Sequence, residues 1–180
     1  MRGDLTVKGL HGSMPVRIPA SSTRYEAGEP LYSDTTFTSG ADVAGSAVSV
    51  NSFEIAQADC PVISTNKLGG VAINSCKPFG TGTVVAHRTN VARPVAWIGQ
   101  IHGRAETVAS VDTTTELLLL IGDATLIDYN ATGGTDSGEL YTIKETASAD
   151  TSGLVIVDGN VTKSELHVIV DGRSYRHDVA

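Results

Sequence analysis

The stretch Gly153–Val179, GLVIVDGNVTKSELHVIVDGRSYRHDV, indicates the fold class of the chain. Its β-branched runs are separated by the pairs Asp158-Gly159 and Asp171-Gly172. Asp-Gly is a preferred pair for the two-residue turns that join antiparallel strands. The stretch therefore predicts a three-stranded β-meander.

The same turns predict which side chains of the meander share a face. Leu166, Val168 and Val170 would share one face with Tyr175. His167 would lie on the other face, diagonal to Asp178. No GxSxG or comparable nucleophile context accompanies this pair. We expect a solvated hairpin face that ends a domain, and no catalytic site.

Short strands are also indicated further upstream in the chain. GTGTVVAHRTN (residues 80–90) and RPVAWIGQIHGRAETVASV (residues 93–111) carry β-branched runs. Apolar residues rarely recur with the helical period of 3.6. The predicted fold class is all-β, with a small β-barrel or sandwich-like body, an extended N-terminal arm and a C-terminal β-meander.

The segment TTTELLLLIGDATLIDY, residues 113–129, has two interpretations. Leu is a good helix former, and Thr113–Thr115 with Glu116 could cap a helix. Gly122 interrupts the apolar run, however, and a short apolar run between polar turns also fits a buried strand. We favour the strand.

Composition divides the chain into three predicted parts. Residues 1–24 form an arm that contains Pro15 and Pro19, and residues 1–25 carry a charge of about +3 within a total of −7. We expect the arm to be extended and poorly ordered unless a partner holds it, the alternative being a frayed terminus. Residues 25–130 form the body. The Gly- and Ser-rich loop at residues 130–138 separates it from a C-terminal extension, residues 131–180.

Whole-chain properties exclude several function classes. A length of 180 residues with 41% hydrophobic and 18% charged residues is typical of a folded domain. The net charge of −7 argues against a nucleic-acid partner. The longest apolar run, residues 117–121, is too short to cross a membrane. We expect no secretory signal, synthesis in the host cytoplasm, and free thiols at Cys60 and Cys76.

Other residues that could carry chemistry give weak signals. His87 and His102 lie on predicted strands without a third metal ligand beside them. The glycines of residues 67–83 do not form a phosphate-binding loop. Trp97 has apolar neighbours and is expected in the core. We expect no catalytic residue, no metal and no cofactor.

Two segments resemble the small β-barrel capsid decoration, or cement, proteins of tailed phages. They are TRYEAGEPLY (residues 23–32) and residues 80–123. In that family a turn opens a strand, and a later strand leads through Gly- and Thr-rich turns to a final aliphatic strand. The matching stretches are residues 27–30, 98–101 and 117–121. The ending, residues 152–180, is similar to that of lambda-type head decoration proteins. The minimal cement barrel lacks the piece after Gly133.

The resemblance implies a non-enzymatic virion protein on the capsid exterior. Its partner would be the major capsid protein, and it would form a homotrimer or another homo-oligomer. A mobile arm that pairs with a shell protein would gain main-chain hydrogen bonds only when bound. We expect the contacts to come from residues of the arm: Arg2, Leu5, Val7, Lys8, Val16, Arg17, Ile18 and Arg24.

Two other functions remain open from the sequence. One is a tail, baseplate or fibre-associated β module that binds carbohydrate, although such a module favours exposed aromatic residues and only 5% of this chain is aromatic. The other is a small β-barrel enzyme that uses His87 or His102.

Overall fold

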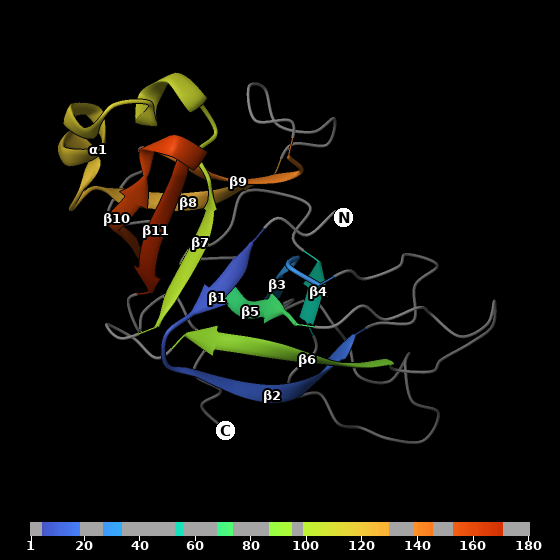
Figure 1. The fold of residues 1–180 in the computed structure, drawn as a ribbon. Helices are drawn as coiled ribbons and strands as arrows, with labels where there is room; N and C mark the ends of the chain where they lie inside the picture. Colours follow the sequence, from blue (N-terminus) through green and yellow to red (C-terminus); the bar gives the residue numbers. More distant parts are fainter. Residues whose placement is uncertain are drawn as a thin grey trace, which may run out of the picture.

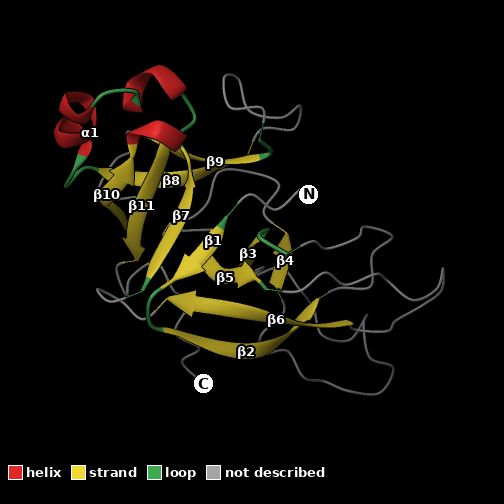
Figure 2. Ribbon diagram, in the orientation of Figure 1, coloured by secondary structure: helices red, strands yellow, loops and turns green. Residues whose placement is uncertain are grey.

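The computed structural model describes residues 5–18, 27–33, 53–55, 68–73, 87–94, 99–129, 139–145 and 153–170. Strands dominate these residues, which confirms the all-β prediction (Figures 1 and 2). The strands are β1 (Thr6–Lys8), β2 (His11–Ile18), β3 (Pro30–Ser33), β4 (Phe53–Ile55), β5 (Leu68–Ala72), β6 (His87–Pro94), β7 (Gln100–Arg104), β8 (Ala124–Tyr129), β9 (Tyr141–Lys144), β10 (Leu154–Asn160) and β11 (Glu165–Val170). The helical elements are η1 (Val108–Val111), α1 (Thr114–Leu120) and η2 (Val161–Lys163).

The described strands form two antiparallel sheets. The six-stranded sheet has the order β1-β7-β11-β10-β8-β9, and the five-stranded sheet has the order β2-β6-β5-β3-β4. The chain passes from one sheet to the other twice, between β1 and β2 and again between β6 and β7. The two sheets meet where β1 of the six-stranded sheet lies beside β6 (Figure 1).

Neither sheet closes into a barrel through its described strands. The six-stranded sheet nevertheless curves, because Ala105, which directly follows β7, forms an isolated bridge with Ile143 of β9. The Glu106 amide also donates to the Ile143 carbonyl at 2.9 Å. Of the barrel and sandwich forms expected from the sequence, the closed barrel is not observed in the described part of the chain.

One hydrophobic core contains residues from both sheets. Its interior follows the alternation of β-strands, since Ile101, Leu166 and Val168 point inward while their chain neighbours Gln100, His102 and His167 are only partly buried. The buried cluster consists of Leu5, Leu68, Val71, Ala72, Ile101, Ala105, Val111, Leu117, Ile127, Tyr141, Ile143, Leu154, Ile156, Leu166, Val168 and Val170.

The predicted N-terminal arm is part of both sheets where the structure describes it. β1 pairs with β7, and all of β2 pairs with β6, from His11 opposite Pro94 to Ile18 opposite His87. Leu5 is 2% exposed and belongs to the core. The expectation of a separate arm is thus corrected for residues 5–18, because β1 and β2 pair with other strands of this chain and Leu5 is buried in its core. Residues 1–4 and 19–24 lie outside the described part.

The predicted boundary at residue 130 does not separate two structural units in the described residues. β8 pairs with β9 and β10, and β11 pairs with β7. The strands of the expected C-terminal extension are therefore interleaved with those of the body. The second turn of the predicted meander, Asp171-Gly172, lies outside the described residues.

Residues 114–120 form helix α1, so the strand favoured for this segment is wrong. Thr113 and Glu116 make a capping box, in which the Thr113 hydroxyl accepts from the Glu116 amide at 3.2 Å and Glu116 Oε2 accepts from the Thr113 amide at 3.0 Å. Gly122 follows with a φ of +97° and donates to the Ile156 carbonyl. The capping box therefore defines the start of α1 and Gly122 follows its end, and strand β8 begins only at Ala124.

The predicted turn at Asp158-Gly159 is also wrong. Both residues lie within β10, and the chain turns through η2 and Ser164, which adopts a left-handed conformation with a φ of 49°. A Cβ atom at Gly159 would lie 2.7 Å from Leu117 Cδ1 and 2.6 Å from the Glu165 carbonyl oxygen. Glycine is needed here for close packing and not for a turn.

In the described part of the chain, no helix is long and apolar enough to span a membrane.

Candidate metal centre

Two histidines from strands far apart in the sequence lie side by side on the six-stranded sheet. His102 in β7 and His167 in β11 are directly opposite each other. Their rings are stacked, with centroids 3.6 Å apart and planes 11° from parallel. Ile101 and Val168 form the next pair along and point into the core, so strand alternation directs both imidazoles to the outer face.

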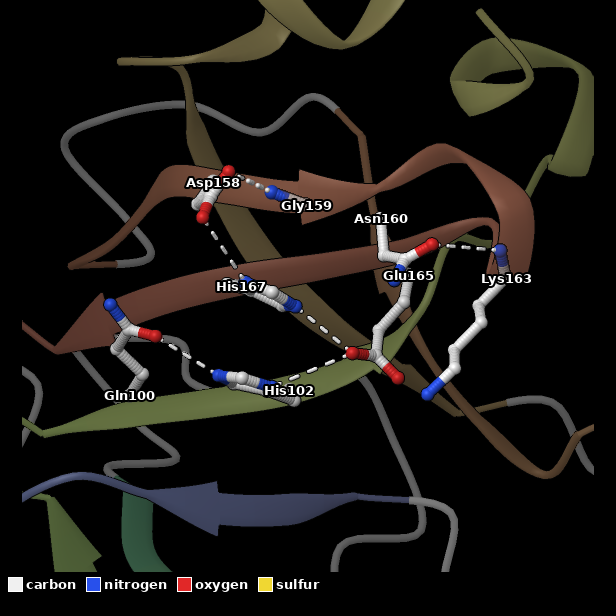
Figure 3. A network of polar contacts seen from close by, with 8 residues as sticks. All are labelled: Gln100, His102, Asp158, Gly159, Asn160, Lys163, Glu165 and His167. Carbon is white, nitrogen blue, oxygen red and sulfur yellow. Dashed lines mark hydrogen bonds and ion pairs between the residues drawn. The ribbon is translucent and has the colours of Figure 1, made fainter. Parts of the chain in front are cut away.

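Glu165 completes the cluster from the same face of β11. It lies two residues before His167, and side chains at this spacing share a face. Its Oε1 is 2.9 Å from His167 Nε2 and 3.5 Å from His102 Nδ1 (Figure 3). The His102 and His167 side chains are each 15% exposed and that of Glu165 is 25% exposed. One carboxylate therefore faces both rings in a partly buried position.

Each imidazole has another polar neighbour on the side away from Glu165. His102 Nε2 is 2.9 Å from Gln100 Oε1, and His167 Nδ1 is 3.7 Å from Asp158 Oδ2 (Figure 3). A register shift in β10 between Ile156 and Asp158 places Asp158 opposite His167. Without this bulge, Val157 would occupy that place. Asp158 is held further by its own Oδ1, which accepts from the Gly159 amide at 2.8 Å.

The electrostatics of the cluster disfavour charge on His102. Burial lowers its pKa, and the neighbouring His167 and Lys8 lower it further, while Glu165 acts in the opposite direction. Two stacked rings cannot both be protonated without repulsion between like charges. The site thus favours neutral imidazole at His102, which is the form that binds metals.

The donor types of the cluster suit a metal ion. His102, Glu165 and His167 each offer a ligand atom, and these atoms lie within 4.8 Å of one another. Two imidazole nitrogens and one carboxylate oxygen are a ligand set found at zinc sites that keep a fourth position for water.

The structure separates the residues that the sequence analysis had considered together. His102 is paired with His167, whereas His87 lies in β6 of the other sheet. Asp178, expected beside His167, lies outside the described residues, and Asp158 is the residue opposite His167 in β10. The third ligand, whose absence had argued against a metal, is Glu165. Its signal is a repeated pattern of a side-chain oxygen donor two residues before a histidine, in Gln100-x-His102 and Glu165-x-His167.

The residues predicted to bind the capsid are distributed over both sheets in the described part. Leu5 is buried and Val7 packs partly against the core, while Lys8 is exposed in β1. Val16, Arg17 and Ile18 lie in β2 of the other sheet. Arg2 and Arg24 are outside the described residues. The role of these residues in binding stays a prediction.

No protein-family model matches the chain, and no curated protein matches it. Among solved structures, the N base of the head fiber gp8.5 of bacteriophage phi29 is similar to this chain with a TM-score of 0.38 and 17% sequence identity. The match covers 93% of this chain and 99% of the phi29 chain.

Proposed function

We propose that this chain is a structural protein of a tailed-phage head that binds the outer surface of the assembled capsid shell. The proposal rests on the resemblance of residues 23–32 and 80–123 to capsid decoration proteins. The turn at Ala27–Pro30, the first stretch of that resemblance, is the observation that carries it.

This turn opens a strand, as the family pattern requires. Ala27 and Gly28 form the turn and β3 begins at Pro30. Gly28 has a φ of +89°, a conformation that glycine adopts readily. The Gly28 amide donates to the Ala72 carbonyl at 2.7 Å, and the Leu5 amide donates to the Gly28 carbonyl at 3.3 Å. The turn therefore fastens the N-terminal segment to β5, which gives it a structural role.

The other two stretches of the resemblance give a mixed result. Of residues 98–101, Ile98 lies outside the described residues, and Gln100 and Ile101 lie in β7, in agreement with the expected strand. Leu117–Ile121, expected as the final aliphatic strand, belongs to helix α1 and its C-terminal cap. The part of the family pattern that the structure supports is thus the opening turn and the central strand.

The most apolar exposed surface in the described residues is on α1 and its end. Leu118 is 63% exposed, Leu119 is 74% exposed and Ile121 is 41% exposed. Leu117, between the same caps, is buried, so the helix already has a face for the core. Contiguous exposed apolar side chains are a common mark of protein contacts. We propose that Leu118, Leu119 and Ile121, here called the α1 tip, contact the shell protein. This contact would add to any contact by the basic residues near the N-terminus.

The test is decoration of shells in solution. Purified protein is mixed with empty heads of the phage that encodes it, assembled without it, and bound protein is measured by sedimentation. We expect saturable binding to assembled shells and much weaker binding to unassembled capsid protein. Equal binding to both, or to neither, would overturn the proposal. Analytical ultracentrifugation of the free protein tests the homotrimer or other homo-oligomer separately.

A further inference from the structure

We propose that His102, Glu165 and His167 bind one divalent transition-metal ion of the zinc type. The ligand atoms are Nδ1 of His102, Nε2 of His167 and a carboxylate oxygen of Glu165. This inference rests on the geometry of the six-stranded sheet and is independent of the proposed function.

The two ring nitrogens that face Glu165 share one of its carboxylate oxygens. Glu165 Oε1 is 2.9 Å from His167 Nε2 and 3.5 Å from His102 Nδ1. A carboxylate oxygen only accepts hydrogen bonds, so each ring nitrogen must carry a proton to be attracted to it. A single metal ion can attract all three atoms at once, because each has a lone pair to offer.

On the side away from Glu165, each histidine has an oxygen near its second ring nitrogen. Gln100 Oε1 accepts from His102 when the proton is on Nε2, which leaves Nδ1 free as a ligand. Asp158 Oδ2 lies 3.7 Å from Nδ1 of His167 and would attract a proton to Nδ1 once a metal replaced the contact of Nε2 with Glu165. Metal-binding histidines usually donate their second ring N–H to a carboxylate or carbonyl oxygen. Gln100 lies within hydrogen-bond distance of His102, and Asp158 lies just beyond that distance from His167.

The backbone around the ligands is well defined. β7 and β11 pair from Glu165 opposite Arg104 to Ile169 opposite Gln100. β10 lies on the other side of β11, and its bulge sets the position of Asp158. The ligands are therefore carried by paired strands and not by loops, which limits the rearrangement that binding requires.

The chemistry of the ligands selects the class of metal. Calcium and magnesium prefer oxygen ligands, whereas imidazole suits zinc, copper and nickel. Partial exposure of the three side chains leaves room for water at a fourth position. Two neutral imidazoles and one carboxylate carry a charge of −1. A divalent cation bound to them would leave a net charge of +1, and the nearby carboxylate of Asp158 balances this charge.

Binding would change the arrangement of the two rings. A metal lies close to the plane of each imidazole that binds it, because the nitrogen lone pair lies in that plane. Rings that are 11° from parallel and 3.6 Å apart cannot both meet this condition at one ion. We expect the rings to turn apart when the metal binds, and any proton on the ligand nitrogens to be released to solvent.

Isothermal titration of the full-length, chelator-treated protein with zinc chloride tests the site. We expect a binding event of one zinc per chain that the double substitution Glu165→Gln/His167→Gln weakens at least about tenfold. Asp158→Asn should weaken it less than the double substitution does, because this residue is not itself a ligand. His11→Gln is the matched control, since His11 is exposed and contacts the Gly9 carbonyl instead. Unchanged affinity in the double variant would overturn the proposal, as would no zinc binding by the unsubstituted chain.

Nuclear magnetic resonance of the unsubstituted protein keeps the test open if the double variant does not fold. Long-range proton–nitrogen spectra of the imidazole rings report which nitrogen is bound. We expect zinc to shift Nδ1 of His102 and Nε2 of His167, while His11 stays unchanged. Zinc that binds without shifting these two nitrogens would place the metal elsewhere and overturn the assignment.

Discussion

The Leu5 side chain occupies the space that a side chain at Gly103 would need. A Cβ atom at Gly103 would lie 2.6 Å from Leu5 Cδ2 and 3.1 Å from Ile143 Cγ1. The sequence predicts that the two residues belong to different parts of the chain, an arm and a body. Their close contact joins the N-terminal segment to β7. Through Ile143 it also joins this segment to β9, the last strand at the other end of the same sheet.

Three glycine substitutions should separate packing from backbone effects. Gly103→Ala should lower the free energy of unfolding by about 1–3 kcal/mol, because the core has no room for the methyl group. Gly159→Ala should cost at least as much, since its nearest neighbour is the Glu165 carbonyl oxygen in the backbone. Gly12→Ala is the control, because no atom lies within 4 Å of a Cβ there. Urea denaturation measures all three, and an equal loss at Gly12 would contradict this explanation.

Leu5→Ala should lower the free energy of unfolding by about 2–5 kcal/mol, as is usual for a buried leucine. Leu10→Ala is a suitable comparison, since Leu10 is 55% exposed and should change stability by less than about 0.5 kcal/mol. Thermal unfolding followed by circular dichroism gives both values. If Leu5→Ala were as harmless as Leu10→Ala, the N-terminal segment would be the separate arm that the sequence had suggested.

The capping box of α1 gives a local test of the helix. Thr113→Ala should lower the free energy of unfolding by about 1 kcal/mol, because the Glu116 amide loses its hydrogen-bond acceptor. Thr113→Ser should retain most of the stability, since serine offers the same oxygen. Chemical denaturation measures the difference. Equal stability of the alanine and serine variants would argue that the cap does not stabilise the fold.

The features of the fold that could be predicted from the sequence are the local ones. β-Branched runs marked β7, β10 and β11, and the Ala27–Pro30 pattern marked a turn before a strand. The role of Gly159 could not be predicted, because it depends on Leu117 packing against β10. The helix at residues 114–120 was visible in its capping residues, but five consecutive apolar residues fit a strand equally well.

The candidate site was less accessible to sequence reasoning. The spacing in Glu165-x-His167 shows that two side chains share a strand face, but it does not identify the neighbouring strand. His102 meets them only because β7 pairs with β11 in one particular register. The bulge in β10, which brings Asp158 to His167, has no clear signal in the sequence.

The α1 tip should matter for binding and little for stability. Leu118→Gln/Leu119→Gln should change the free energy of unfolding by less than about 0.5 kcal/mol per site, because both side chains are largely exposed. Under the proposed function, the same variant should bind phage shells at least about tenfold more weakly. Sedimentation with shells measures this loss. Full binding by a folded variant would remove the α1 tip from the contact surface.

Glu145 should make the stability of the protein depend on pH. It is 9% exposed and accepts a hydrogen bond from the Thr107 amide at 2.5 Å. Burial raises its pKa above 4.5, and nearby Glu106 raises it further, while the Thr107 amide and Lys144 act in the opposite direction. The folded protein therefore holds this proton more strongly than the unfolded chain. Stability should fall as the pH rises from about 4.5 through the pKa of the folded state.

Glu145→Gln isolates this contribution, because glutamine still offers an oxygen to the Thr107 amide but does not ionise in this range. We expect the variant to lose less stability than the unsubstituted protein between about pH 4.5 and neutral pH. Glu116→Gln should have the opposite effect below about pH 4.5, since the hydrogen bond from Thr113 lowers the pKa of Glu116 and the stability from its ionised form is lost as the pH falls through that lowered pKa. The unfolding free energy of each protein, measured in urea at several pH values, tests both signs. Parallel pH profiles for the Glu145 variant and the unsubstituted protein would show that burial of this carboxylate has no consequence for folding.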